Sequence, residues 1–126
     1  MLNPKSKIRV LIVEDLIDVR TPIKIGLELS GFDVIEAECG KTAMEQVSHS
    51  PDVIIIDYGL PDITGLEVAA RIRNLENGSK FLIAVLTGTD GTELRNEAKS
   101  VRCDGYFTKP LSILKLTKWI NENISS

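Results

Sequence analysis

Four groups of polar residues could act together in chemistry, because each directly follows a short apolar run. They are Glu14-Asp15, Asp57, Thr87 and Lys109-Pro110. Carboxylates that lie close together repel one another and raise one another's pKa unless a cation intervenes. Mg²⁺ suits this task, since it prefers one or two carboxylates, further oxygen ligands and several waters. With a lysine and a threonine hydroxyl nearby, such a set can bind and transfer a phosphoryl group, and a carboxylate is then the nucleophile that forms an acyl phosphate.

Asp57 ends the apolar, β-branched run Val53–Ile56, and glycine and proline residues follow it. An apolar run without polar alternation is typical of a strand buried on both faces of a parallel sheet. Asp57 is therefore expected at the C-terminal end of a buried strand, at the edge where open parallel α/β sheets bind ligands. On this stretch alone, an aspartate that caps a turn or the next helix is an equally good interpretation.

Strands and helices are predicted to alternate five times along the chain. The predicted strands span residues 8–13, 33–37, 53–56, 81–86 and 105–108. The predicted helices span about residues 18–30, 41–48, 65–75, 92–101 and 112–124. This alternation favours an α/β fold with one parallel sheet, helices on both faces and right-handed crossovers. Because parallel strands end at the same edge, the four polar groups should converge in one cleft.

The first predicted helix has recognisable start and stop signals. Ile23 and Leu27 lie four residues apart and belong to its inward face. Asp18 is predicted as its N-cap, and Gly31 is predicted to end it. Pro22 is tolerated only near the first turn of a helix, so it limits how far upstream this helix can begin.

Composition narrows the class of protein. The chain has 126 residues, 43% hydrophobic and 26% charged, which describes one globular domain. Its net charge is −3, and its basic residues form no stripe along the sequence. Both observations argue against direct nucleic-acid binding. Cys39 and Cys103 are far apart and lack the paired spacing of a zinc site. No apolar run is long enough for a membrane span or a signal peptide, so we expect a cytoplasmic protein without membrane contact, with free thiols.

Four segments of the chain resemble the receiver domain of two-component response regulators, the CheY-like family. They are Val10–Asp15, Ile54–Gly65, Val85–Gly88 and Gly105–Pro110. The resemblance covers essentially the whole chain, with the motifs in order and at family-like spacing. It implies a flavodoxin-like, doubly wound (βα)5 fold, in which a single five-stranded parallel sheet carries five helices on both faces. It also implies one receiver domain over residues 1–126, with no effector domain in this chain.

The resemblance implies a role for each polar group. Asp57 would accept a phosphoryl group from a phosphohistidine on a sensor histidine kinase or a histidine phosphotransfer protein. Asp15, Asp57 and the backbone carbonyl of Gly59 would bind Mg²⁺ directly, and Glu14 would act through a bound water. Lys109 would pair with Asp57 and then with the phosphoryl group. The bond from Lys109 to the next residue would be cis, as X-Pro bonds can be.

The resemblance also implies a switch. Thr87 would reorient to hydrogen-bond the phosphoryl group, and Tyr106 would turn inward behind it. The face made by the fourth helix, fifth strand and fifth helix would then differ for an unidentified downstream partner. From composition alone, Tyr106 is an edge-strand aromatic that covers the sheet. The chain would be a signalling switch in phosphorelay signal transduction, catalysing phosphorylation and dephosphorylation of its own aspartate, and not an enzyme with a separate substrate.

Thr64, Gly88 and Gly59 are among the positions that depart from the commonest pattern of the family. Thr64 stands where an aspartate often precedes the glycine, which affects the hydrogen bonding of this loop. Gly88 is smaller than the usual alanine or serine, and Gly59 has no side chain to shield the site. We therefore hypothesise that donors and water enter easily and that the aspartyl phosphate is short-lived.

Other residues have simpler interpretations. His49 is expected to be a solvated surface residue at a helix end. Trp119 is expected to cover a helix edge in part, with a partner patch as the alternative. Ile25 and Leu29 form a second apolar pair on the first helix, which would either widen its buried face or dock a kinase helix.

Two other function classes compete with the phosphoacceptor. A pseudo-receiver would keep the fold as a protein-interaction module that works without phosphorylation. The presence of Asp57, Asp15, Thr87 and Lys109 argues against it. A small α/β hydrolase, such as an acid-dependent phosphatase, would need a second catalytic acid two residues after the nucleophile, where Gly59 stands.

Overall fold

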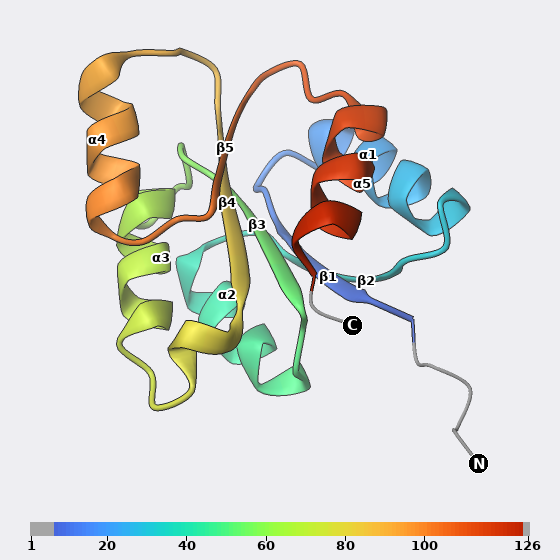
Figure 1. Cartoon of the computed structure of the whole chain (residues 1–126), viewed down its shortest axis with the longest axis horizontal. Helices are drawn as coiled ribbons and strands as arrows, with labels where there is room; N and C mark the ends of the chain where they lie inside the picture. The colour runs from blue at the N-terminus through green and yellow to red at the C-terminus, as the bar shows by residue number, and fades with distance from the viewer. Residues whose placement is uncertain (1–6, 125–126) are drawn as a thin grey trace.

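The computed structural model describes residues 7–124, which hold one five-stranded parallel sheet (Figure 1). In chain order its strands are β1 (Arg9–Val13), β2 (Asp33–Ala37), β3 (Val53–Asp57), β4 (Leu82–Thr87) and β5 (Gly105–Thr108). Their order across the sheet is β2-β1-β3-β4-β5, and each neighbouring pair is parallel. The predicted fold class and strands are confirmed. The expectation about a signal peptide concerns residues 1–6, which lie outside the described residues.

Five α-helices connect and follow these strands within residues 7–124. They are α1 (Ile17–Leu29), α2 (Gly40–Gln46), α3 (Gly65–Arg73), α4 (Thr92–Ser100) and α5 (Ile113–Asn123). Two short 3₁₀ turns, η1 (Val47–His49) and η2 (Gly78–Lys80), lie after α2 and before β4. Figure 1 shows α1 and α5 on one face of the sheet and α2, α3 and α4 on the other.

The core lies on both faces of the sheet, because successive strand residues point to opposite faces. In β3, Ile54 and Ile56 pack against α2 and α3, whereas Val53 and Ile55 pack against α1 and α5. Every residue of β3 is buried. Burial of one such aliphatic side chain stabilises the fold by about 2 kcal/mol. The uninterrupted apolar run therefore makes β3 a fixed central strand that ends on Asp57.

Helix α1 begins earlier than we predicted. Asp18 is not its N-cap: the cap position is Leu16, which makes no side-chain cap hydrogen bond, and Asp18 lies in the first turn. The backbone N–H of Leu16 donates to the Glu14 carboxylate at 3.2 Å, which turns the chain into the helix before Asp18 is reached. Pro22 consequently lies inside the helix. The burial of Ile23 and Leu27 against the sheet offsets the backbone hydrogen bond that a proline lacks.

Two other helix ends also differ from the prediction. The stretch 41–48 is not one helix: α2 ends at Gln46, and a 3₁₀ turn follows, which ends at Ser50 in a left-handed conformation with φ of 56°. Helix α3 ends at Arg73 and not at Leu75, which is 38% exposed. A Cβ at Gly78 would overlap the carbonyl of Ile72, so this glycine lets η2 fold back against the end of α3.

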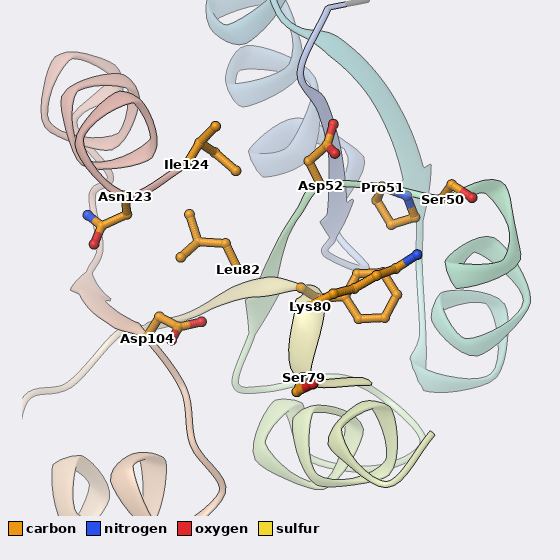
Figure 2. Close-up of a pocket in the computed structure, with 10 residues that line it drawn as sticks. Ser50, Pro51, Asp52, Ser79, Lys80, Leu82, Asp104, Asn123 and Ile124 are labelled. Carbon is orange, nitrogen blue, oxygen red and sulfur yellow. The ribbon is translucent and has the colours of Figure 1, made fainter. Parts of the chain in front are cut away.

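A hollow of about 390 Å³ lies at the edge of the sheet where β3 and β4 begin. Figure 2 shows Asp52, Lys80 and Asp104 around it. The Asp52 carboxylate accepts a hydrogen bond of 2.9 Å from the backbone N–H of Arg9, and Asp104 accepts one of 2.9 Å from that of Ile83. Because both carboxylates accept hydrogen bonds from strand backbones, we assign a structural role to the residues around this hollow.

Candidate functional site

A second, open pocket of about 360 Å³ lies at the opposite edge, where the parallel strands end. It is lined by Glu14, Asp15, Leu16, Asp57, Tyr58, Gly59, Thr87, Gly88, Thr89 and Lys109. The structure thus brings together the four polar groups that follow the apolar runs, and Gly59 lies among them. Tyr106 is the one residue proposed from the sequence that does not line this pocket.

Asp57 is held in place by the backbone around it. It is the last residue of β3 and pairs with Leu86 of β4. The next residue, Tyr58, donates its backbone N–H to the carbonyl of Leu86 at 2.8 Å and accepts from Gly65 at 2.8 Å. A Cβ at Gly65 would overlap the backbone carbonyl of Asp57, so only glycine lets α3 begin this close to the strand. The Asp57 side chain is therefore buried, with 5% of the residue exposed, at the floor of the pocket.

Three carboxylates form an acidic cluster in this pocket. Oxygen atoms of Glu14, Asp15 and Asp57 all lie within 4.8 Å of one another. Burial raises the pKa of Glu14, and the nearby charge of Asp57 raises it further, against a lowering hydrogen bond from the backbone of Leu16. Nearby positive charge would favour the charged form of these carboxylates.

Lys109 supplies part of the missing positive charge. Its Nζ lies 2.8 Å from Asp57 Oδ1 and 3.2 Å from Glu14 Oε1. Burial lowers the pKa of Lys109, but the hydrogen bonds to Asp57 and Glu14 outweigh this and raise the pKa above its ordinary value. The amine is therefore charged at neutral pH. Its backbone is also fixed, because the N–H of Lys109 donates to the carbonyl of Thr87 at 2.8 Å and the Lys109-Pro110 bond is cis.

The acidic cluster fits a hard divalent cation. Its donors are carboxylate oxygens, which Mg²⁺ prefers, and the pocket is open enough for the water ligands that Mg²⁺ retains. The three acids are not equivalent, however. Both oxygens of Glu14 already have protein partners, since Oε1 contacts Lys109 and Oε2 accepts from the backbone of Leu16. Asp15 and Asp57 are thus the better candidates for direct ligands.

Thr87 is buried at the end of β4, with 3% of the residue exposed. Its Oγ1 accepts a hydrogen bond of 3.3 Å from the backbone N–H of Thr89. This bond uses the hydroxyl as an acceptor, so its proton stays available for a group in the pocket.

Tyr106 does not line the pocket itself but contacts Thr89, which does. Its ring is half-buried against a small cluster of Leu66, Val85 and Ala98. Its hydroxyl donates to the carbonyl of Thr89 at 3.2 Å. Tyr106 therefore reaches Thr87 only through Thr89, a residue that the sequence analysis did not single out.

Asp62 is a second residue that sequence reasoning missed. Its carboxylate accepts hydrogen bonds of 2.8, 3.0 and 2.9 Å from the backbone N–H groups of Gly40, Lys41 and Ile63. The bond to Gly40, together with the others, lowers the pKa of Asp62. Asp62 thereby ties the loop after β3, which carries Gly59, to the start of α2. No local pattern predicts a contact between residues 22 apart in sequence.

The two glycines at the pocket leave it unshielded, as expected. A Cβ added at Gly88 would meet nothing within 4 Å. A Cβ added at Gly59 would lie 3.7 Å from Asp57 Oδ2, an ordinary contact distance. Gly59 and Gly88 could therefore both be replaced by alanine without a steric clash. Thr64, the third departure, caps α3 by accepting from the backbone of Glu67 at 3.2 Å.

His49 and Trp119 lie as their simpler interpretations predicted, and the structure decides whether Ile25 and Leu29 are buried. His49 is exposed. Trp119 packs on the core, with its ring 5.3 Å from that of Phe107 in an edge-to-face arrangement. Ile25 and Leu29 are 50% and 84% exposed, so they do not widen the buried face of α1. Cys39 and Cys103 are free thiols, and within residues 7–124 no helix is long and apolar enough to cross a bilayer.

Curated relatives share this chain's sequence over most of its length. The phosphate regulon transcriptional regulatory protein PhoB of Pseudomonas aeruginosa is 34% identical over 104 residues, which are 82% of this chain and 45% of that protein. The transcriptional regulatory protein PhoP of Escherichia coli (strain K12) is 38% identical over 106 residues, 83% of this chain and 47% of that protein. The chain thus spans less than half the length of these relatives.

Solved structures share its fold. The chemotaxis response regulator CheY4 of Vibrio cholerae superposes with a TM-score of 0.86 at 29% identity, covering 93% of this chain and 98% of that one. The CheY-like receiver domain protein of Methanospirillum hungatei JF-1 gives 0.85 at 25% identity, covering 93% of each chain. The family model of the response regulator receiver domain matches residues 10–121, a range that holds the acidic cluster, Thr87 and Lys109. With its fold, its strand-end side chains and this match in agreement, the chain belongs to the response regulator receiver domain family of two-component signalling.

Proposed function

We propose that this chain is a phosphoacceptor switch in which Asp57 takes a phosphoryl group from a phosphohistidine. The observation that carries the proposal is the contact of 2.8 Å between Lys109 and the buried Asp57 carboxylate, inside an acidic cluster at the strand ends. A carboxylate in this position has a fixed backbone, a cationic neighbour and an open side toward solvent. These are the properties that an in-line acceptor of a phosphoryl group needs.

The reaction would be a direct transfer between two side chains. A carboxylate oxygen of Asp57 attacks phosphorus as the bond from phosphorus to the histidine nitrogen breaks. The electron pair of that bond returns to the imidazole, and an acyl phosphate forms on Asp57. The ammonium of Lys109 neutralises charge on the transferring oxygens, and the Thr87 hydroxyl donates to one of them. Hydrolysis of the acyl phosphate at the same site would return the switch to its resting state.

Asp15 and Asp57 would hold Mg²⁺ directly, with the Gly59 carbonyl as a third ligand and Glu14 acting through a water. When bound, the ion would neutralise the acidic cluster and the incoming phosphoryl oxygens. The residues of the chain would position the lysine: Glu14 accepts a hydrogen bond from Lys109, and the backbone N–H of Leu16 donates to Glu14.

The switch would run from Thr87 to Tyr106 through Thr89. A phosphoryl group on Asp57 would draw the Thr87 hydroxyl toward it and change the hydrogen bond that Thr87 accepts from Thr89. Because Thr89 also accepts from Tyr106, the ring would respond and turn fully inward. The face of α4, β5 and α5 would then differ for a downstream protein partner.

The donor would be a sensor histidine kinase or a histidine phosphotransfer protein. Apolar side chains on and beside α1 offer a docking surface next to the pocket: Leu16, Ile17, Ile25 and Leu29 are 56%, 62%, 50% and 84% exposed. Residues 1–126 would act as a single receiver domain in the cytoplasm. The PhoB and PhoP relatives are described as transcriptional regulatory proteins, but the net charge of −3 favours a protein contact over direct nucleic-acid binding here.

The competing function classes have less support. A pseudo-receiver has no need to keep a lysine charged beside a buried aspartate. A hydrolase would need an acid where Gly59 lies. We further propose that the aspartyl phosphate is short-lived, because neither Gly59 nor Gly88 shields Asp57. A half-life of many hours at neutral pH would contradict this last point.

Intact mass spectrometry after incubation with acetyl phosphate and Mg²⁺ tests the proposal. We expect the mass of one phosphoryl group on the wild type and none on Asp57→Ala. Asp52→Ala is a matched control, because Asp52 directly precedes the same strand at the end opposite to Asp57. Labelling of neither the wild type nor the control would favour the pseudo-receiver, and labelling of Asp57→Ala would place the acceptor elsewhere.

A further inference from the structure

The loop that follows Thr87 is weakly packed where it covers the pocket. Gly88 and Thr89 line the pocket, and α4 begins at Thr92. A Cβ added at Gly88 or Gly91 would meet nothing within 4 Å. Backbone packing alone therefore does little to fix this loop, and the side chains that contact it decide where it lies.

Arg95 of α4 reaches back to this loop. Its Nε and Nη2 donate to the two carboxylate oxygens of Asp90 at 2.7 and 3.1 Å. Both side chains are about half exposed, 50% and 53%. An exposed ion pair of this kind stabilises a fold very little. Its two-pronged geometry, however, fixes the orientation of the guanidinium plane.

The same guanidinium lies over the ring of Tyr106, with Cζ 4.3 Å from the ring centroid. This distance is within the range of a cation–π contact. The Tyr106 hydroxyl in turn donates to the carbonyl of Thr89 at 3.2 Å. Asp90, Arg95, Tyr106 and Thr89 thus form a closed ring of contacts that joins the loop, α4 and β5. We call these four residues the Arg95 latch.

We propose that Arg95 is a positioning residue that holds Tyr106 against the β4–α4 loop before any phosphoryl group is present. The Thr89 backbone donates to Thr87 Oγ1 and accepts from Tyr106, so a held ring also holds the loop beside the phosphoacceptor. The contacts of the Arg95 latch thus keep the Tyr106 ring half-buried beside the loop, part of the way to the fully inward position proposed for the phosphorylated state. Contacts of this kind shift a population between two arrangements, without a new contact to substrate. This inference rests on the proposed function of Asp57 for its kinetic consequence, but not for the position of the ring.

The experiment uses Arg95→Ala, Arg95→Lys and the control Arg71→Ala. Arg71 is a matched control because it also forms an exposed arginine–carboxylate pair, with Glu67. Its guanidinium is not among those that stack on an aromatic ring within the described residues. Arg95→Lys keeps the charge but loses the planar fork, so it should restore the behaviour only in part.

The first readout is independent of phosphorylation. The two tyrosines, Tyr58 and Tyr106, are labelled with ¹³C in their rings, and their NMR signals are assigned with Tyr106→Phe. Arg95→Ala should shift the Tyr106 ring signals toward those of an averaged, mobile ring and leave Tyr58 in place. Unchanged Tyr106 signals would overturn the proposal, whatever the rate of phosphorylation.

The second readout is the rate of labelling by acetyl phosphate with saturating Mg²⁺. We expect Arg95→Ala to be slower by about two- to fivefold, the size of an exposed cation–π contact, with Arg95→Lys between it and the wild type. Arg71→Ala should match the wild type. Tyr106 signals that move while the rate stays unchanged would also overturn the proposal. Absence of labelling in the wild type would instead count against the function of Asp57, and the ring signals would still test the latch.

Discussion

Lys109 Nζ lies 2.8 Å from Asp57 Oδ1, although 52 positions separate the two residues (109 − 57). The same amine also contacts Glu14, so one cation bridges two of the three clustered carboxylates. This bridge offsets part of the negative charge of the three acids at the end of the sheet. It also places positive charge where a phosphoryl group on Asp57 would carry its negative charge.

Replacement of Lys109 by alanine should slow labelling of Asp57 by acetyl phosphate at least about tenfold, the scale on which a preorganised charge or donor contributes to such transfers. The acidic cluster would lose its only close amine among the described residues. Lys115→Ala is the control, since Lys115 is an exposed lysine of α5. Equal rates for Lys109→Ala and the wild type would remove Lys109 from the proposed chemistry.

Mg²⁺ should raise the thermal unfolding midpoint of the wild type by several degrees at saturating concentration, because a ligand that binds only the folded state stabilises it. Asp15→Asn should lose most of this rise. Asp18→Asn, a change of the same kind three residues further on, should keep it. The measurement is differential scanning fluorimetry across a Mg²⁺ titration. The same rise in wild type and Asp15→Asn would exclude Asp15 as a ligand.

Arg73 should contribute strongly to stability, since its side chain is only 6% exposed and bonds several partners. It donates to the carbonyls of Gly78, Phe81 and Arg102 and to the Asp104 carboxylate. Arg73→Lys should lower the free energy of unfolding in urea by about 2–3 kcal/mol, because the carbonyls of three residues lose donors. Arg71→Lys, on the exposed side of the same helix, should change it by less than about 0.5 kcal/mol. Similar losses at both positions would contradict this account.

Glu36 should make stability depend on pH in acid. Burial acts to raise its pKa, but the hydrogen bonds from Arg20 and Lys24 outweigh burial and hold the pKa below its ordinary value. The stabilisation is fully present above the ordinary pKa of a glutamate, where Glu36 is charged in both states. It is lost as the pH falls through the lowered pKa of the folded state, because the unfolded chain takes up its proton first.

Urea unfolding of the wild type and Glu36→Gln from pH 7 to pH 3 measures this effect. The variant should be less stable at pH 7, and the difference should shrink as the pH falls. A difference that is constant over this range would show that the contact does not act through the charge of Glu36.

Cys103 should be nearly inert at neutral pH. Burial raises the pKa of its thiol to about 11. At pH 8 its thiolate fraction is then about a hundredfold below that of an ordinary cysteine, so alkylation by iodoacetamide should be slower by a similar factor. Peptide mass spectrometry can compare Cys103 with Cys39 in the same sample. Equal alkylation of both thiols in the folded protein would contradict the prediction.

The sequence by itself determined the fold class and the edge at which the polar side chains meet. Val53–Ile56 is apolar without alternation, and a strand of this kind is stable only between two layers of helices. Once the strands are parallel, their ends share an edge, so Asp57 and Lys109 had to approach each other. This inference needs only the hydrophobic periodicity, which is a local property of the chain, and the parallel sheet that the alternation of strands and helices implies.

Tertiary structure alone decided the contacts that fix these residues. Asp62 caps the start of α2, and Arg95 lies over Tyr106. Each contact joins groups whose patterns in sequence are those of ordinary polar surface residues. Periodicity reports which side of an element is buried, whereas these hydrogen bonds and the cation–π contact depend on how far apart the packed elements come to lie, and only the packed core sets that distance.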